Sequence, residues 1–209
     1  MIKKEKNKKN WSIVSIIVGS LFILGGITCL FVDWYKDYKL NKIDSNSVEI
    51  FFEEETPVAT TEEVKETKTT PEVINYIAVL EIPKISLKRG LVDINSRKNN
   101  VNYNIEILDS SDMPNVTNSN LILASHSGSG RVAFFRNLYK MEIGDYSHIY
   151  YENEKYTYQV TKIYEEDKDG LITLKRNKDK TTLTMITCSQ TNKTKHIVVI
   201  SKFVSKENY

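Results

Sequence analysis

The sequence predicts a mostly β domain, either a closed barrel or a sandwich, that follows a single transmembrane helix. Two observations lead to this prediction. An uncharged apolar stretch of 22 residues lies close to the N-terminus, at residues 11–32. From about residue 73 onward, short apolar or alternating runs follow one another, separated by turn-forming residues. Seven or eight short strands with almost no helix are typical of closed barrels and sandwiches.

The apolar stretch at residues 11–32 has the length of a membrane span. A helix of this length rises about 33 Å, which is enough to cross a hydrocarbon core of about 30 Å. A cleaved signal peptide would have a shorter apolar region and a small-residue cleavage site, which Gly25–Cys29 matches poorly. Five lysines in residues 1–10 indicate a cytoplasmic N-terminus by the positive-inside rule. We therefore expect a cytoplasmic tail, an uncleaved anchor in the cell membrane, and an extracellular remainder.

The rest of the chain divides by composition. Residues 33–72 are rich in Glu, Lys and Thr and poor in apolar residues, so we expect an extracytoplasmic stalk that is largely disordered. An exception within it is Val48–Phe52, which could form a short helix or strand. Residues 73–209 are long enough for one domain with its own core. The net charge of +2 gives no electrostatic reason to expect nucleic-acid binding.

Within residues 73–209 the apolar pattern predicts most elements. A core strand is expected where the apolar run is continuous, and exposed strands where polar and apolar residues alternate. One pair of strands should form a hairpin around residues 152–154. We expect strands at residues 77–82, 85–88, 120–124, 147–151, 155–163, 181–187 and 196–203, and a helical turn at 132–139.

Two residues that could carry chemistry each follow an apolar run. Cys188 ends the run Thr184–Cys188, and His126 follows residues 121–125. A thiol attacks a carbonyl only as the thiolate, and a neighbouring imidazolium is the usual group that favours this ionisation and then acts as general acid. Cys29 lies in the predicted span, so Cys188 has no disulfide partner in the outer domain. A buried, inert thiol is the alternative interpretation of Cys188.

Other interpretations of the polar residues are weaker. His148 fits a surface or cross-strand role in its predicted hairpin. Structural zinc needs four ligands, often in close pairs, and no such spacing occurs. The acidic run Glu165–Asp167, with Asp169, is read as a solvated loop before the Cys188 strand, and calcium binding is the alternative. We therefore expect no metal and no cofactor, with calcium as the one candidate.

At this point the residues match a family. The chain resembles the sortases, the membrane-anchored transpeptidases of Gram-positive bacteria, over about residues 77–203. The elements occur in the family's order: an entry strand with Ile-Pro-Lys-Ile, the His that follows an apolar strand, a Phe-Phe-Arg-Asn-Leu segment with Gly-Asp after it, and a Thr-Met-Ile-Thr-Cys signature. They are Ile77–Ile85, Ala124–His126, Phe134–Leu138 with Gly144–Asp145, and Thr184–Cys188.

The resemblance implies a closed eight-stranded barrel and a two-step reaction. Cys188 would attack the Thr–Gly bond of an LPxTG-like sorting signal at the C-terminal end of a secreted protein, and a thioester would form. The amine of a cell-wall peptide precursor or of a pilin lysine would then resolve the thioester. His126 would protonate the departing amine and deprotonate the incoming one.

One family residue differs. Sortases carry an Arg early in the strand after the Cys loop, and the direct alignment places His196 there. Arg is always charged and has five donors, whereas His has two at most. We therefore take His196 as the third catalytic candidate. Lys195, Arg131 and Arg136 are alternatives for the missing cation, although Arg136 fits a structural role better.

The subclass stays open, with class B or class D as the interpretation of the recognised pattern. Pilin-polymerising sortases often have an Asp-Pro-aromatic lid motif and a second span, and neither is visible in this sequence. Cell-wall anchoring is therefore favoured over pilus assembly. Two further alternatives are a catalytically impaired sortase-fold binding protein and a membrane-anchored β domain of unrelated function.

Overall fold

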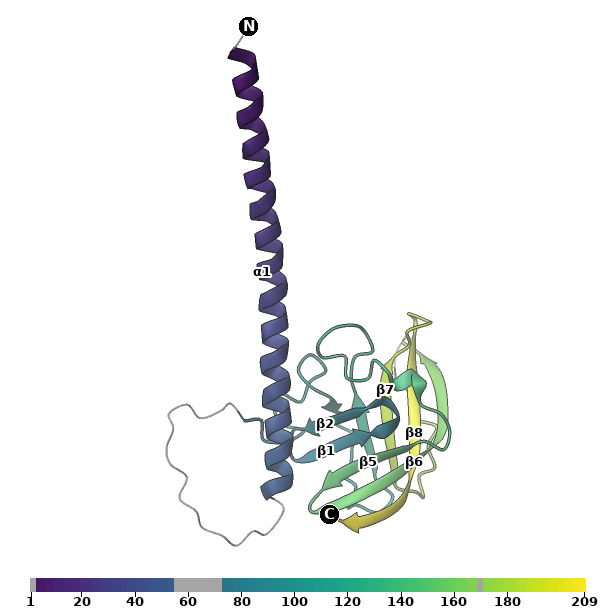
Figure 1. Ribbon diagram of the computed structural model, residues 1–209. Helices are drawn as coiled ribbons and strands as arrows, with labels where there is room; N and C mark the ends of the chain where they lie inside the picture. Colours follow the sequence, from purple (N-terminus) through teal and green to yellow (C-terminus); the bar gives the residue numbers. More distant parts are fainter. Residues whose placement is uncertain (1–2, 55–72, 169–170) are drawn as a thin grey trace, which may run out of the picture. The chain divides into compact units, whose positions relative to one another are not determined.

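The computed structural model describes residues 3–54, 73–168 and 171–209 (Figure 1). The chain divides into two compact units, Met1–Lys42 and Ile43–Tyr209. The boundary lies within one long helix, α1 (Lys3–Glu54). The end of this helix therefore belongs to the same unit as the β domain that follows it.

The first unit consists of helix α1 up to Lys42. From Val14 to Val32 its apolar side chains are exposed, and the helix is long and apolar enough to cross a membrane. Apolar side chains that face outward along a whole helix need a nonpolar environment. This part of α1 is compatible with a single-pass membrane anchor, as expected for residues 11–32.

The expectation of a largely disordered stalk is wrong for residues 33–54. These residues are helical and continue α1 without a break, while residues 55–72 lie outside the described part of the chain. The segment contains no Gly and no Pro. Its last turns carry Phe51, which is buried, and Val48 and Phe52, which pack in the same apolar cluster. Burial of this apolar face offsets the entropy lost when the helix is ordered. The polar composition of the segment gives no sign of this burial.

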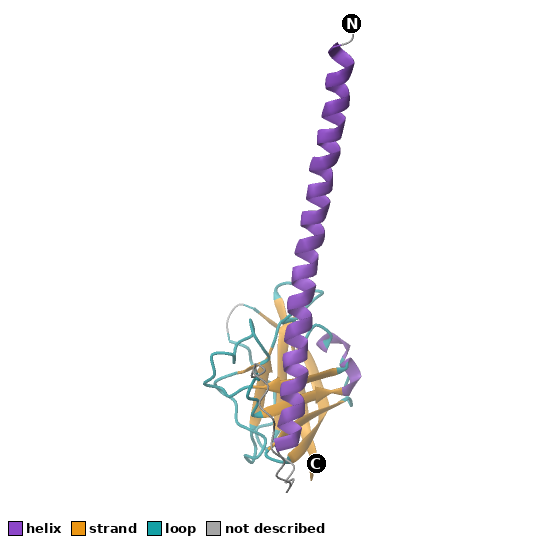
Figure 2. Ribbon diagram, turned by 60° about the vertical axis from the view of Figure 1, so that its left-hand side comes forward, coloured by secondary structure: helices purple, strands orange, loops and turns teal. Residues whose placement is uncertain are grey.

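The β domain forms a single sheet of eight strands (Figure 2). The strand order across the sheet is β2-β1-β5-β6-β8-β7-β4-β3. All neighbouring strands are antiparallel except β4 and β7, which are parallel. The strands are β1 (Ala78–Ile82), β2 (Leu87–Leu91), β3 (Glu106–Ile107), β4 (Asn120–Ala124), β5 (Tyr146–Tyr151), β6 (Glu154–Asp167), β7 (Thr182–Cys188) and β8 (Lys195–Asn208), with two 3-10 turns, η1 (Pro83–Ile85) and η2 (Leu138–Lys140).

Most predicted strands are present, and three details differ. The strand expected at 85–88 begins at Leu87, because the 3-10 turn η1 starts at Pro83. The helical segment expected at 132–139 is reduced to turns and η2. The acidic run Glu165–Asp167 is the end of β6 and not a loop, because β6 pairs with β8 as far as Asp167. The two-residue strand β3 has no sequence signal of its own.

The sheet curls into a nearly closed barrel, which confirms the predicted fold class. Its interior is filled by large apolar side chains such as Leu80, Phe135 and Tyr158, all fully buried. Near the two edge strands, Asn104 donates its side-chain amide to the carbonyl oxygen of Gly90 at 2.8 Å. A side-chain hydrogen bond therefore links β2 with the segment that leads into β3, where no strand ladder closes the barrel.

Strands β4, β7 and β8 are apolar on both faces. Met185 and Val199 belong to the main core inside the barrel, while their neighbours Ile186 and Val198 pack with Ile122 in a separate cluster. Because successive side chains of a strand point to opposite faces, this second cluster lies on the outside of the barrel. We call this side the groove face.

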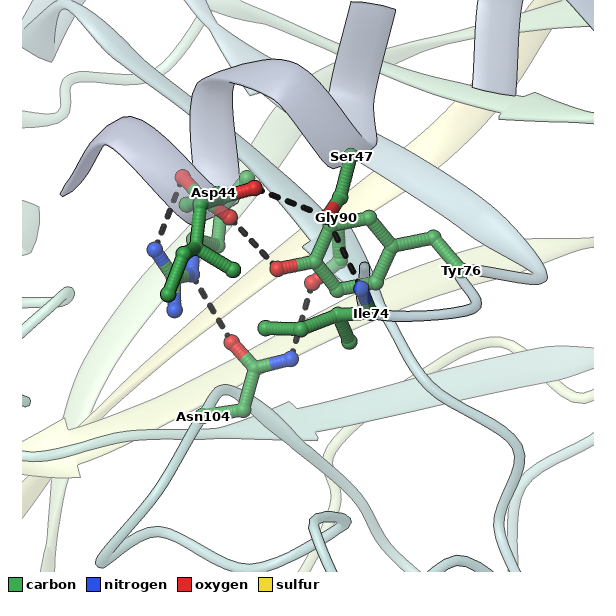
Figure 3. Close-up of polar contacts among 8 residues, drawn as sticks. Asp44, Ser47, Ile74, Tyr76, Gly90 and Asn104 are labelled. Atoms are coloured by element: carbon green, nitrogen blue, oxygen red, sulfur yellow. Dashed lines mark hydrogen bonds and ion pairs between the residues drawn. The ribbon is translucent and has the colours of Figure 1, made fainter. Parts of the chain in front are cut away.

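The end of α1 is fixed to β2 and to the segment before β1 by a polar network (Figure 3). Asp44 accepts a hydrogen bond from the Tyr76 hydroxyl at 2.5 Å and pairs with the Arg89 guanidinium at 2.7 Å. Ser47 accepts from the backbone N–H of Ile74 at 2.9 Å. Burial raises the pKa of the Tyr76 hydroxyl, so it remains a donor. Arg89 and Asp44 have side chains about 13% and 14% exposed, which makes this ion pair stronger than a surface pair.

Glycine at position 90 is required by a close approach. A Cβ atom at Gly90 would lie 2.1 Å from a ring atom of Tyr76, far inside van der Waals contact. The Tyr76 ring therefore packs directly on the backbone of β2 while its hydroxyl reaches Asp44 (Figure 3). Any side chain at position 90 would displace the ring and break the network.

We expect Asp44→Ala to lower the free energy of unfolding of the β domain by roughly 2–4 kcal/mol, since it leaves the Arg89 charge without its buried partner. Glu49→Ala removes a carboxylate from an exposed position of the same helix and should change stability little. Denaturant unfolding of the full chain in detergent, followed by near-ultraviolet circular dichroism, measures both. Equal losses in the two variants would contradict a structural role for Asp44.

We also expect Gly90→Ala to lower the free energy of unfolding by about 1–3 kcal/mol through the clash with Tyr76. Gly128→Ala is the matched control, because a Cβ at Gly128 meets nothing within 4 Å. The same unfolding measurement compares the two. If Gly90→Ala is as stable as the Gly128 variant, the packing of the Tyr76 ring on β2 does not contribute to stability.

Candidate active site

The parallel pairing of β4 with β7 brings the two principal candidates to one end of the sheet. Ala124 pairs with Ile186, and the Ser125 N–H donates to the Ile186 carbonyl at 3.3 Å. His126 lies two residues beyond Ala124, and Cys188 lies two residues beyond Ile186. Parallel strands end at the same edge, so the sequence separation of 62 residues disappears in space.

Cys188 and His196 face each other across the β7–β8 ladder. They are register partners in an antiparallel pair, and such partners project from the same face of the sheet. Ile186, two residues before Cys188, and Val198, two residues after His196, belong to the outer apolar cluster. By alternation, the Cys188 thiol and the His196 imidazole lie on the groove face. Cys188 is a free, partly buried thiol.

Side-chain hydrogen bonds hold the ends of β4 and β7 together. The Thr187 hydroxyl donates to the Ser125 carbonyl at 2.7 Å, and Thr187 is buried. Beyond Cys188, the Gln190 amide donates to the carbonyl oxygens of Ser127 at 2.9 Å and Arg136 at 2.5 Å. These bonds fix the segment after the thiol to the segment after His126. Sequence reasoning missed Gln190, because a lone glutamine in a loop gives no signal.

A second missed residue lies beside His126. The Nε2 atom of the imidazole is 3.5 Å from the side-chain oxygen of Asn102, which is a long contact. The His126 carbonyl accepts from the Phe135 N–H at 3.2 Å, which holds the backbone of the loop. Asn102 stands in an Asn-rich stretch before β3, where only the fold shows its position. It can orient the imidazole without being a proton carrier.

The environment of His196 keeps its imidazole neutral. Burial lowers its pKa below the ordinary value of 6.5, and the positive charge of Lys168 lowers it further. Its buried Nδ1 atom has no hydrogen-bond partner among the described residues. The Lys168 ammonium donates to the carbonyl oxygen of Lys193 at 2.8 Å, a neutral acceptor, so its charge is retained. Lys168 is a cation near the site that the sequence analysis did not consider.

The other candidates for a missing cation lie elsewhere. Lys195 is the neighbour of His196 on β8, and its ammonium lies 3.9 Å from Asp167, its register partner on β6. Arg136 donates to the carbonyl oxygens of Ser129 and Gly130, both at 2.9 Å, in the structural role expected for it. Arg131 lies exposed in the loop after His126.

His148 is remote from this end of the sheet and has the cross-strand role expected for it. Its Nδ1 lies 3.1 Å from the hydroxyl of Thr157 on the neighbouring strand β6. Burial, with Lys155, lowers its pKa. His148 therefore takes no part in the arrangement around Cys188.

The acidic residues at the end of β6 have separate partners. Glu165 accepts from the Ser189 hydroxyl at 2.8 Å, and Glu166 pairs with Lys175 at 2.7 Å. Asp169 lies outside the described residues. Among the residues that the structure describes, no three His, Cys, Asp or Glu side chains are grouped as metal ligands.

The groove face differs in character on the two sides of Cys188. Toward the start of β7 it is apolar, because Ile122, Ile186 and Val198 form a cluster against which Ile172 and Leu174 pack. On the opposite side lies a polar hollow of about 500 Å³, lined by the segments after His126 and Cys188. An apolar segment could bind on one side of the thiol and a polar group on the other.

Comparison with known proteins agrees with the fold. The family model described as sortase domain matches residues 80–204. No curated protein matches the sequence. Among solved structures, sortase C1 from Streptococcus agalactiae is 30% identical, covering 62% of this chain and 68% of its own, with a TM-score of 0.55.

Two more distant structures share the fold. A sortase D5 transpeptidase from Clostridium perfringens is 23% identical over 78% of this chain and 99% of its own, with a TM-score of 0.58. Sortase A from Listeria monocytogenes is 19% identical over 64% of this chain and 90% of its own, with a TM-score of 0.54. Because the family model matches well over half of the sequence, from the first strand of the barrel to the last, this chain belongs to the sortase family.

Proposed function

We propose that this chain is a cysteine transpeptidase that cleaves an LPxTG-like sorting signal and transfers the secreted protein to an amine of the cell wall. The observation that carries the proposal is the parallel β4–β7 pair, because Cys188 and His126 follow these two strands at the same edge of the sheet. In support, the family model spans the whole barrel. The apolar span in α1 would hold the enzyme in the cell membrane, with the β domain outside the cell.

In the first step the Cys188 thiolate attacks the carbonyl carbon of the threonine in the sorting signal. The C–N bond to the next residue breaks, and the departing amine takes a proton from the His126 imidazolium. The products are a thioester on Cys188 and the released C-terminal fragment. Ile172 and Leu174, which pack on the buried outer cluster and are themselves partly exposed, would provide a surface for the Leu-Pro part of the signal.

In the second step an acceptor amine attacks the thioester. His126, now neutral, removes the proton of this amine, and the C–S bond breaks, which restores the Cys188 thiolate. The polar hollow next to Ser127 and Gln190 is on the side of the thiol away from the apolar cluster, so it suits the departing and incoming amines.

His196 and Lys168 together take over the role of the family's Arg in this proposal. The His196 imidazole, neutral above its lowered pKa, donates to the developing oxyanion, and Lys168 supplies positive charge nearby. The position of His196 supports this assignment, because it is the register partner of Cys188 on the neighbouring strand and lies on the same face of the sheet.

We expect Cys188→Ala to abolish formation of the thioester, and His126→Ala to lower the turnover rate by about 10²–10⁴-fold. A sorting-peptide library based on Leu-Pro-x-Thr-Gly, incubated with the full chain and an amine acceptor, reports cleavage and transfer by mass spectrometry. Wild-type protein should show an acyl adduct on Cys188, and Ser205→Ala, at an exposed position of β8 away from the candidate site, serves as control. Cleavage that persists in Cys188→Ala would refute the proposal.

Substitution of His196 should separate its hydrogen bond from its charge. We expect His196→Gln to retain more activity at pH 7–8 than His196→Ala, because the imidazole is neutral there and an amide is also a neutral donor. His196→Arg should maintain or raise activity. Values of kcat/KM for the three variants decide the matter, and an inactive Arg variant that still folds would show that His196 does not stand in for the family's Arg.

A further inference from the structure

A basic pocket lies on the groove face at a distance from Cys188. It has a volume of about 750 Å³ and is lined by parts of β6, β8 and the segment before β7. The pocket contains five cationic side chains and a single carboxylate, that of Asp179. The cations are Lys162, Lys175, Arg176, Lys180 and Lys202.

Most of this positive charge is available to a ligand. Lys175 is paired with Glu166 at 2.7 Å, so its charge is offset. Arg176 donates to the carbonyl oxygens of Asn118 at 3.2 Å and Lys180 at 3.3 Å, which are neutral. Within the described part of the chain, no carboxylate forms a salt bridge with Lys162, Arg176, Lys180 or Lys202. A cluster of cations without counter-charges favours an anionic ligand.

The pocket lies in line with the candidate active site. Thr182 lines the pocket and is six residues before Cys188 on the same strand and the same face, which corresponds to about 20 Å. The apolar cluster of Ile186 and Val198 lies between the two. The order along the groove face is therefore the thiol, the apolar cluster with Ile172 and Leu174 packed on it, and the basic pocket.

We propose that the basic pocket binds acidic residues of the substrate protein, about six to eight residues before the bond that Cys188 attacks. An extended peptide advances about 3.3 Å per residue, so six residues span the 20 Å between the thiol and the pocket. This inference rests on the proposed function. It adds a preference for acidic residues upstream of the sorting signal, provided by Lys162, Lys180 and Lys202.

Three peptides with one fixed Leu-Pro-x-Thr-Gly core test the inference. The peptides differ only at the two positions seven and eight residues before the scissile bond, which are Asp-Asp in one peptide, Asn-Asn in the second and Lys-Lys in the third. With the full chain in detergent we expect the Asp-Asp peptide to have a KM about three- to tenfold below that of the Asn-Asn peptide, because exposed ion pairs are individually weak. The Lys-Lys peptide should have the highest KM, kcat should be similar for all three, and added salt should reduce the differences.

A double variant assigns the preference to the pocket. Lys180→Gln with Lys202→Gln should make the three peptides equivalent. Lys98→Gln with Lys140→Gln removes two exposed lysines that do not line the pocket, and should leave the order of the peptides unchanged. Equal KM values for the three peptides with wild-type protein would overturn the inference, as would a charge preference that survives in the Lys180 and Lys202 variant.

Binding to the Cys188→Ala chain, measured by fluorescence anisotropy of the same peptides, separates the two proposals. Tight binding of the Asp-Asp peptide that depends on Lys180 and Lys202, with no cleavage by wild-type protein, would support the pocket and refute the transpeptidase. Cleavage of all three peptides at equal rates with equal affinities would support the transpeptidase and refute the pocket.

Discussion

The candidate site depends on one constraint, the parallel pairing of β4 with β7 in a sheet that is otherwise antiparallel. Because both strands run toward the same edge, the residues that follow them meet there. The neighbours β3 and β8 are antiparallel to this pair, so they begin at that edge and bring Asn102 and His196 with them. With either strand reversed, His126 and Cys188 would lie at opposite ends of the sheet, about a strand length apart.

The outer apolar cluster exists because three neighbouring strands are apolar on both faces. In most antiparallel strands one face is buried and the other is polar. In β7, Met185 faces the barrel core, whereas Ile186 faces the outer cluster together with Ile122 and Val198. These outer residues lie outside the barrel core and are buried in their own cluster, on which the partly exposed side chains of Ile172 and Leu174 pack.

Local patterns in the sequence predicted most of the strands and a helix long and apolar enough to span a membrane, while the roles of Cys188 and His126 stay predictions. Local patterns cannot predict which strands pair, because the register depends on contacts between residues far apart in the chain. Gln190, Asn102 and Lys168 were missed for this reason: each stands in a polar segment and becomes informative only beside the site. The segment around Asp44 was misread as a stalk because its polar composition hides a docked helix end.

In the proposed mechanism, His196 and Lys168 divide between them two properties that an arginine combines. A guanidinium carries a permanent charge and several donors in one group. In the proposed mechanism the imidazole supplies the donor, and Lys168, the residue after β6, supplies positive charge; burial and then this charge lower the pKa of His196. The two effects are linked, because the cation that favours an oxyanion also keeps the imidazole neutral. A neutral donor beside a fixed cation can therefore stabilise negative charge without a change of protonation near neutral pH.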